Sequence, residues 1–534
     1  MKVLLIQPPI EDFYDTSIRT YPLNLLYVAA RVKNLCDVSV VDLRTGRKRT
    51  RPFPEQYQGL TPFYRDDTYT PFSLFRRYYR FGATRDEIRT TIRNEAPSIV
   101  GISASYTTYS MEALEVARIA KEVDADIVTV MGGTHATLFP QHLLKHSFVD
   151  YVIRGEGETP FAWLVEMLQK GADPRSNPIH GVSFRNENHF HVSEINVEKE
   201  IDLLPYRRDL SPEMYRINKK KYAFMLTSRG CPFACRFCGK PPVPYRKRDL
   251  ASIEREIDDC VGLGIEAVDF EDDMLNLDKP FFAKVLELAC DKNLTLSAMN
   301  GIYPETIDIP LLESMHAAGF QRLNFSLVDA AESVLEKQAR SLPKAFLEIL
   351  SWLESSPFLV ETHFIIGLPG QRPEDVLDTL VFLMGKRLLL GPSIFYLAPG
   401  SETFQQIMGD DWESYVKLMR SSAMYPANPL FPRETTYTLM KLVRFINYVK
   451  QAVDRSSDMR FVSELAEALP ADKTYEREIV RRLVKEKLLT WYVLNEQILR
   501  EEPQDLDLIR LFFNKARGLS IRGFKTNNSV KVDV

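Results

Sequence analysis

Residues 228–240 read SRGCPFACRFCGK and contain three of the chain's six cysteines, Cys231, Cys235 and Cys238. Thiolate sulfur is the ligand that iron–sulfur clusters take, so three thiolates in one short loop can bind three corners of a four-iron, four-sulfur (4Fe–4S) cube. The fourth iron then stays open to the amine and carboxylate of a bound molecule, to which a reduced cluster can pass one electron. The spacing therefore favours a cluster whose last ligand comes from outside the protein.

A structural zinc site is the alternative interpretation of these cysteines. Such a site normally takes four protein ligands, often from two spaced pairs. The other cysteines, Cys260 and Cys290, fall in helix-like segments, and the nearest histidines in the sequence, His191 and His316, are far from the triad. The missing fourth ligand favours the cluster but leaves zinc open.

The cysteines follow the first of six strand-like runs that alternate with helical patterns between residues 216 and 405. Right-handed parallel crossovers curl such βα units in one direction, which predicts a partial (β/α)6 barrel of the TIM type. Reactive groups in barrels lie at the carboxyl ends of the strands, where the cysteines stand. The predicted strands are FMLTS, IEAVDF, LTLSAMN, RLNFSL, LVETHFIIG and SIFYLA.

Residues 1–170 show an earlier alternation of Val/Ile-rich runs with helices of ten or more residues, which predicts a parallel, doubly wound (Rossmann-like) sheet. Ligands of such sheets bind beyond the carboxyl ends of the strands. Those ends carry small or polar residues, namely Ser103, Ser105, Thr107 and Thr108 after one strand and Gly132, Gly133, Thr134 and His135 after the next.

The remaining segments complete the predicted domain organisation. Residues 171–215 are polar and rich in proline, which predicts a hairpin and linker, and residues 406–534 predict a helical C-terminal domain. Residues 45–82 form an insertion of arginines and aromatic residues. It could stack and pair with nucleic acid, but the acidic balance of the chain favours a packed cover over the edge of a cofactor site, with solvated arginines.

Composition limits the class of protein. With 534 residues, 45% of them hydrophobic, the chain can bury two or three cores, and its net charge of −4 does not suggest a polyanion partner. No window reaches the roughly 18 to 20 apolar residues of a membrane span, and the opening apolar run is too short for a secretory signal. Six cysteines are too few for a disulfide framework, so we expect a protein of the cytoplasm.

The pattern Cys-x-x-x-Cys-x-aromatic-Cys, filled by Cys231, Cys235, Phe237 and Cys238, resembles the signature of the radical S-adenosylmethionine (SAM) superfamily. The resemblance implies a 4Fe–4S cluster that cleaves SAM reductively to methionine and a 5′-deoxyadenosyl radical, with Phe237 near the adenine. It also implies a low-potential electron donor such as flavodoxin or ferredoxin.

Other segments resemble the same superfamily. FEDDMLN resembles the acidic segment that binds the methionine amine, and FIIGLPGQRPED and YLAPGSETF resemble its fifth- and sixth-strand turns. On the fourth strand NFSLVDA departs from the usual Gly-x-Glu-Ser, so a ribose contact falls to Ser326 or Asp329. The residues that this resemblance assigns to SAM are Phe237, Glu271, Asp272, Asp273, Asn300, Ser326, His363 and Gly367, whereas exposed turn residues are the alternative for the three acids.

Residues 1–170 resemble the cobalamin-binding domain that precedes the barrel in many such enzymes. The motif Asp-x-His-x-x-Gly, which supplies an axial histidine to cobalt in some cobalamin proteins, is absent, and a doubly wound domain without cobalamin is the alternative. His135 is favoured as a hydrogen-bonding residue of the loop rather than a metal ligand. The residues that this resemblance assigns to cobalamin are Ser103, Ser105, Thr107, Gly132, Gly133, Thr134, His135, Gly155 and Glu156.

Together these resemblances predict a cobalamin-dependent radical SAM enzyme that transfers a methyl group to an unactivated carbon of an organic substrate whose class the sequence does not reveal. Relatives of this type also form rings, oxidise substrates or couple carbon atoms, and these reactions remain open. A non-catalytic protein that responds to cobalamin or redox state is the alternative from another class.

Overall fold

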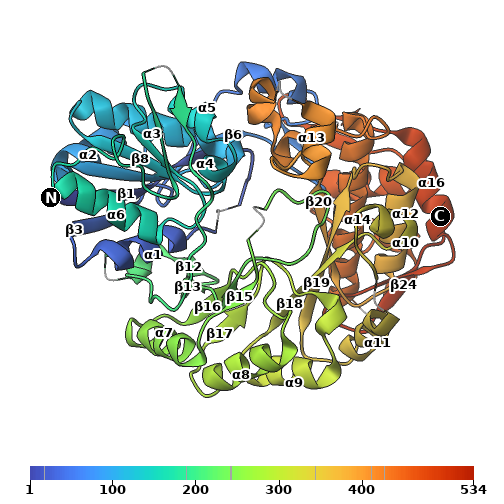
Figure 1. Cartoon of the computed structure of the whole chain (residues 1–534). Helices are drawn as coiled ribbons and strands as arrows, with labels where there is room; N and C mark the ends of the chain where they lie inside the picture. The colour runs from blue at the N-terminus through green and yellow to red at the C-terminus, as the bar shows by residue number, and fades with distance from the viewer. Residues whose placement is uncertain are drawn as a thin grey trace.

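The computed structural model describes residues 1–16, 19–187, 189–207, 209–240, 243–342, 344–409, 412–425, 427–456 and 458–534. An N-terminal α/β domain, a series of six parallel strands and a mainly helical C-terminal region follow one another around a ring (Figure 1). Asn188 of the predicted hairpin and Arg208 of the predicted linker lie outside the described residues.

The N-terminal domain is built on a seven-stranded sheet with the order β11-β10-β9-β8-β7-β1-β3. The strands from β3 to β9 run parallel, and β10 and β11 add an antiparallel hairpin at one edge. The hairpin predicted within residues 171–215 therefore extends this sheet. The bounds are β1 Lys2–Gln7, β3 Asp37–Asp42, β7 Ile99–Ser103, β8 Val128–Gly132, β9 Tyr151–Ile153, β10 Val182–Arg185 and β11 Phe190–His191.

Helices cover both faces of this sheet, which confirms the doubly wound prediction. Side chains alternate along β1, so Val3 and Leu5 join one buried cluster and Leu4 and Ile6 join the other. The first cluster also contains α1 (Leu23–Val32) and α6 (Glu158–Gln169), and the second contains α2 (Arg85–Glu95) and α3 (Ser110–Val123). The short helices α4 (Thr134–Leu138) and α5 (Pro140–Leu144) follow β8.

Six parallel strands follow in chain order. β13, β16 and β17 pair with one another, as do β18, β19 and β20. The isolated parallel bridges Leu296↔Phe320 and Ile302↔Phe325 join the two groups. The bounds are β13 Lys220–Met225, β16 Ala267–Phe270, β17 Thr295–Ser297, β18 Arg322–Val328, β19 Leu359–Ile366 and β20 Leu389–Ile394, with β12 Arg216–Ile217 antiparallel to β13.

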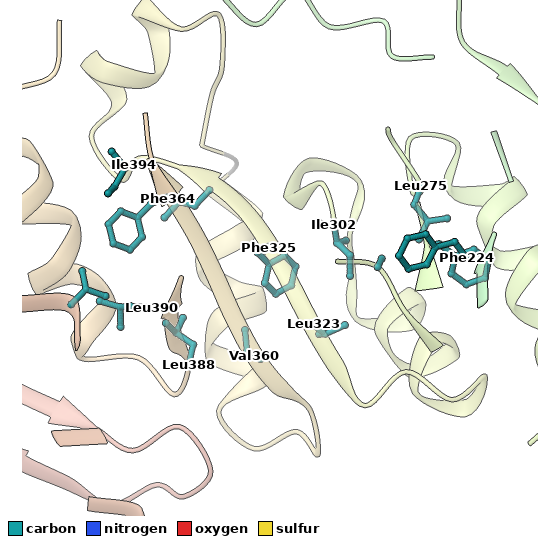
Figure 2. Close-up of a cluster of buried hydrophobic side chains, with 14 of the residues drawn as sticks. Phe224, Leu275, Ile302, Leu323, Phe325, Val360, Phe364, Leu388, Leu390 and Ile394 are labelled. Atoms are coloured by element: carbon teal, nitrogen blue, oxygen red, sulfur yellow. The ribbon is translucent and has the colours of Figure 1, made fainter. Parts of the chain in front are cut away.

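Buried apolar side chains follow this strand series from Phe224 on β13 to Ile394 on β20 (Figure 2). On β19 Val360 and Phe364 are buried, whereas Glu361 and His363 on the opposite face are only half-buried. One face of the strands thus packs on helices and the other carries polar groups. The helices are α7 Leu250–Gly262, α8 Lys279–Ala289, α9 Ile309–Ala317, α10 Glu332–Lys337, α11 Lys344–Leu353 and α12 Pro373–Met384.

The C-terminal region is mainly helical, as predicted, but also contains two small antiparallel strand pairs. Its long helix α14 lies along β20, where the Asn447 side-chain amide bonds both the N–H and the carbonyl of Leu390, at 3.0 and 2.8 Å. Among the described residues, every helix lacks the length or the apolar composition that a membrane span needs. The bounds are α13 Glu402–Met408, α14 Arg433–Arg455, α15 Thr474–Arg481, α16 Leu506–Ala516, β21 Thr490–Val493, β22 Ile498–Glu501, β23 Ser520–Arg522 and β24 Ser529–Lys531.

The insertion at residues 45–82 joins the N-terminal domain to the C-terminal region. Its strand β6 pairs with β2 and β4, whereas β5 pairs antiparallel with β21, more than 400 residues later in the chain. The Phe72 ring packs edge-on against Phe445 and Tyr448, with ring centres 5.7 and 5.6 Å apart. Figure 1 shows this blue segment at the top, beside the orange part of the chain. The bounds are β2 Ile10–Asp12, β4 Lys48–Arg51, β5 Thr68–Tyr69 and β6 Tyr78–Phe81.

Candidate functional site

The cysteines lie in a loop whose described residues are 230–240 and 243–245 and whose two ends are held together. β14 (Ser228–Arg229) pairs antiparallel with β15 (Arg246–Lys247), just beyond the end of β13. Gly230 starts the loop at φ +83°, where a Cβ would collide with the carbonyl of Pro244, so glycine is required there. The cysteine loop therefore stands at the carboxyl end of the first barrel strand, as predicted.

The three cysteines form a donor set suited to an iron–sulfur cube. All three are free and half-buried, and the Cys238 N–H donates to the Cys235 carbonyl at 3.0 Å. Burial raises the pKa of the Cys231 and Cys238 thiols, as do Asp273 and a neighbouring thiol, whereas Lys240 opposes the shift. The thiols are thus within electrostatic reach of one another, which fits a cluster that each cysteine enters through a different iron.

The residues considered for a zinc site do not assemble. No three His, Cys, Asp or Glu side chains among the described residues converge on the position of one metal ion. Cys260 is buried in the core on α7, where burial raises its pKa to about 11 against the opposing charge of Arg207. Cys290 directly follows α8, and its sulfur lies 3.9 Å from the Ala317 carbonyl. His191 belongs to β11 and His316 to α9.

The predicted acidic segment after β16 divides into two roles. Asp272 is buried and accepts hydrogen bonds from the N–H and hydroxyl groups of both Thr227 and Ser228, at 2.6 to 3.1 Å. Burial raises the pKa of Asp272, and these hydrogen bonds oppose the shift. This carboxylate therefore holds the strand end that carries the cysteine loop.

Glu271 and Asp273 face a cavity instead. Glu271 accepts hydrogen bonds from Arg19 of the N-terminal domain at 2.8 Å and from the Asn300 amide at 3.0 Å. Asp273 pairs with Lys240, two residues after the last cysteine. Both carboxylates therefore connect the barrel to another part of the site.

The other predicted SAM residues lie within or just after the later strands. Ser326 on β18 is in register with His363 on β19, and both are half-buried. Asp329, in contrast, is buried and bonded to Gln371 at 2.5 Å and Thr379 at 3.0 Å. Between the two candidates for a ribose contact, Ser326 is therefore the available one.

Phe237 and Gly367 have packing and backbone roles in the described contacts. Phe237 packs against an apolar cluster that includes Leu368 and Phe395, near the carboxyl ends of β19 and β20. Gly367 has φ +94°, and its N–H donates to the Gln371 side chain at 2.7 Å. The Gly-Leu-Pro-Gly turn is thus fixed by its own backbone geometry.

A cavity of about 510 Å³ lies between the N-terminal domain and the first barrel strands. Both sets of predicted cofactor residues contribute to its wall. The predicted cobalamin residues that line it are Ser105, Gly132, Gly133, Thr134, Gly155 and Glu156, and the predicted SAM residues that line it are Glu271 and Asp273. The two predicted sites therefore open into one space.

Two adjacent glycines at the end of β8 differ in their surroundings. A Cβ on Gly132 would meet only the Ile153 side chain, at 3.9 Å, so a larger side chain there would project into open space. Gly133 has φ +122°, and its Cβ would lie 2.8 Å from the Ala104 backbone. This edge of small residues fits the close approach of a large planar corrin. At Gly132 the backbone would accept a side chain, so only the need for open cavity space favours glycine there.

Thr107 and His135 do not line this cavity. The imidazole is fully buried, with Nδ1 3.0 Å from the Thr107 hydroxyl and Nε2 3.1 Å from His142. Burial, aided by His142, lowers the pKa of His135 to about 3. Ser103 is also buried, 2.9 Å from the Ser105 hydroxyl. The hydrogen-bonding role favoured for His135 is thus the one that the structure shows.

Two arginines that the sequence did not single out connect the cysteine loop to the N-terminal domain. Arg246 donates to both oxygens of Glu156, at 2.6 and 2.8 Å, and Arg229 donates to Glu158 at 2.7 Å. All four side chains are at most 17% exposed. We call these four residues the hairpin latch. In the sequence only the basic residues around the cysteines could have suggested the latch. Its carboxylates could not be assigned, because they lie 71 and 90 residues away from the arginines.

The far side of the loop is fixed as well. The Thr403 N–H donates to the Arg236 carbonyl at 3.2 Å, and a Cβ on Gly239 would collide with the Pro399 carbonyl. The segment YLAPGSETF thus packs against the last cysteines. Both ends of the strand series hold the loop in place.

Comparison with known proteins agrees with this geometry. The family model for the B12 binding domain matches residues 76–165, and that for the Radical SAM superfamily matches residues 225–383. An uncharacterized methyltransferase of Pyrococcus horikoshii, PH0819, is 26% identical over 78% of this chain and 87% of its own. An anaerobic magnesium-protoporphyrin IX monomethyl ester cyclase of Rubrivivax gelatinosus is 28% identical over 64% of this chain and 65% of its own.

Among solved structures, the fold is similar to that of the radical SAM methyltransferase TsrM from Kitasatospora setae, solved with cobalamin and a 4Fe–4S cluster bound. The TM-score is 0.57 at 18% identity, over 76% of this chain and 74% of that one. Fold and family matches define a class, the radical SAM proteins that carry a cobalamin-binding domain ahead of the barrel.

The chain joins a B12 binding domain to a Radical SAM domain, so its cofactors are cobalamin and, with a 4Fe–4S cluster, SAM.

Proposed function

We propose that this enzyme transfers a methyl group to an unactivated carbon of an organic substrate. The observation that carries the proposal is the single cavity lined by residues from both predicted cofactor sites. A methyl group and a carbon radical must meet at one atom, so their sources must open into one space. The methyltransferase names of two similar proteins support the same reaction.

Within that proposal the chain's own residues bind and orient. Cys231, Cys235 and Cys238 would hold the cluster, Glu271 and Asp273 would face the amine of SAM, and Gly132, Gly133 and Glu156 would border cobalamin. When bound, these cofactors supply a 5′-deoxyadenosyl radical and a methyl group. The protein holds the cysteine loop in place through the ion pairs of Arg229 and Arg246. The domain limits of this division are residues 1–170, 171–215, 216–405 and 406–534.

The site residues can be tested on the reduced, anaerobic protein. We expect about four irons per chain and cleavage of SAM to 5′-deoxyadenosine, with both lost in Cys231→Ala, Cys235→Ala and Cys238→Ala. Cys290→Ala should keep both, because its sulfur lies at the end of α8. Iron retained in all three triad variants, or zinc in place of iron, would contradict the assignment.

Cobalamin binding needs its own variant. Gly132→Leu should weaken hydroxocobalamin binding by about tenfold or more, because the added side chain enters the cavity without a backbone clash. Gly133→Ala is unsuitable, since its φ of +122° makes any side chain strained. Unchanged affinity in Gly132→Leu would place the corrin elsewhere.

A second candidate reaction is ring formation, favoured by the similarity to the ester cyclase. Oxidation and carbon–carbon coupling use the same radical and stay open with it. These reactions are distinguished by the product, since only methyl transfer adds one carbon from labelled SAM or methylcobalamin. A non-catalytic cobalamin- or redox-responsive protein would cleave no SAM at all.

We further propose that the enzyme acts in the cytoplasm, takes its electron from flavodoxin or ferredoxin, and has no nucleic-acid partner. All six cysteines are free, which suits a reducing compartment. Most aromatic residues of the insertion are buried, Phe63 and Phe72 among them against the C-terminal region, so few are available for stacking on bases. This choice of donor would be contradicted if a chemical reductant supported SAM cleavage and neither flavodoxin nor ferredoxin did.

A further inference from the structure

Arg340 approaches the cysteine loop from the opposite wall. It follows α10, beyond the end of β18, and its Nη1 lies 3.9 Å from the Cys235 sulfur. Nη2 donates to the Ser326 carbonyl at 3.4 Å. The guanidinium is therefore fixed between a barrel strand end and one of the three cysteines.

Two aromatic rings support the guanidinium of Arg340. The guanidinium lies 4.9 Å from the centre of the Tyr303 ring, and that ring lies 5.0 Å from the ring of Phe233 in the cysteine loop. Arginine over an aromatic face is held by the ring's negative face as well as by packing. Arg340 thus belongs to the wall of the cysteine loop by three independent contacts.

The charge of Arg340 is not balanced by a carboxylate. No Asp or Glu within the described ranges forms an ion pair with it, and its buried Nε has no hydrogen-bond partner there. A partly buried cation without a counter-charge costs free energy. The thiolates of a bound cluster would supply negative charge beside it, at the Cys235 sulfur.

We propose that Arg340 is a positioning residue that stabilises the reduced state of the cluster and so raises its reduction potential. The inference rests on the proposed cluster assignment. Each added electron makes the cluster and its thiolates more negative, and a fixed cation beside one sulfur favours the more negative state. Hydrogen bonds and charge near the sulfurs are known determinants of cluster potential. The electron comes from a low-potential donor protein, or from dithionite in the test.

The test compares midpoint potentials in the full chain, reconstituted anaerobically and titrated without SAM. Arg340→Gln should keep its iron but shift the potential negative by about 59 mV, a tenfold change in the one-electron equilibrium. Arg340→Lys keeps the charge and should stay closer to wild type. Arg255→Gln is the matched control, since Arg255 is exposed on α7 and bonds only the Ala251 carbonyl among its described partners.

The outcomes separate the inference from the proposed function. If wild type binds no cluster, the proposed function fails first. If Arg340→Gln binds the cluster with an unchanged potential, this inference is wrong, whether or not SAM affinity falls. A loss of SAM affinity alone would show that Arg340 binds the SAM carboxylate instead. If Arg340→Gln loses the cluster, the midpoint potentials of Arg340→Lys and wild type are compared instead. A large negative shift of the potential in Arg340→Lys, which retains the charge, would overturn the proposal.

Discussion

His135 is the first histidine in the chain, and its imidazole is completely buried against Thr107 and His142. Its pKa is lowered from 6.5 to about 3, so the ring is neutral in the native protein at pH 5 to 7. In the unfolded chain the same ring binds a proton below about pH 6.5. Its contribution to stability is therefore complete above pH 6.5 and is lost as the pH falls from 6.5 toward 3.

This residue gives a testable pH dependence. Between pH 7 and 5, we expect the unfolding free energy of wild type to fall by about 2 kcal/mol more than that of His135→Gln. Denaturant unfolding of the full chain at the two pH values, followed by tryptophan fluorescence, measures the difference. His180→Gln, at an exposed position, should keep the wild-type dependence.

Cobalamin binding at pH 7 should be unchanged in His135→Gln, because the imidazole does not line the cavity. An imidazole-type signal from bound cobalt in wild type that disappears in this variant would show that the loop rearranges to supply an axial ligand.

Residue chemistry in the sequence predicted part of the site. Three thiols at fixed spacing and glycines at a strand end carry a local signal, and the structure gathers them around one cavity. The separate roles of Asp272 and Asp273 had no such signal. One is buried under Thr227 and the other faces Lys240, and this depends on which way each side chain leaves the strand end.

Among the secondary-structure elements, the hairpin β14–β15 was not predicted from the sequence. Each of its strands has two residues, too few for a periodic pattern, so the sequence did not predict it. β20 was predicted at residues 393–398 but spans Leu389–Ile394. Pro392 obscured it, because proline lacks the N–H of a central strand, whereas β20 is the edge strand of its sheet. The longer alternating segments were predicted correctly because each combines an apolar strand with an amphipathic helix.

The hairpin latch should control how long the cluster stays bound. Arg246→Met removes two hydrogen bonds to Glu156 and leaves that carboxylate partly buried, at a cost of about 1.5 to 3 kcal/mol. We expect cluster loss to a chelator to become roughly ten- to a hundredfold faster. Absorbance of the cluster against time measures this rate.

Lys247→Met is the matched control, since Lys247 is the next residue and pairs with Asp278 at a more exposed position. Equal rates for Arg246→Met and wild type would mean that backbone pairing alone holds the loop.

The molecule as a whole is held together by the insertion at residues 45–82. The Tyr64 hydroxyl donates to the Ser422 carbonyl at 2.6 Å, and Phe63 packs on Tyr437. The sequence favoured a packed insertion, and most of its aromatic residues are indeed buried, whereas Tyr69 is exposed. No residue of 45–82 lines the cavity, so its expected place over a cofactor edge stays a prediction. A partner more than 300 residues away cannot be read from local sequence.

This contact should join the domains into one unfolding unit. Phe72→Ala removes a fully buried ring and should destabilise the chain by about 3 to 5 kcal/mol. The midpoint temperature of thermal unfolding should then fall equally when it is followed by the absorbance of bound cobalamin and by far-ultraviolet circular dichroism. Phe461→Ala, at a ring that is 40% exposed, should shift neither probe much. Two separate transitions in wild type would contradict this coupling.

The pairing of β5 with β21 also constrains how the protein is made. Thr68 and Tyr69 leave the ribosome long before Tyr492 and Val493, their partners in the sheet. At 5 to 20 residues per second, the wait for about 420 further residues lasts roughly 20 to 85 s. During that interval Thr68 and Tyr69 lack their strand partners, and Phe63 and Phe72 stay uncovered until α14 has been made. Assembly of the N-terminal half is thus completed only when translation is nearly over.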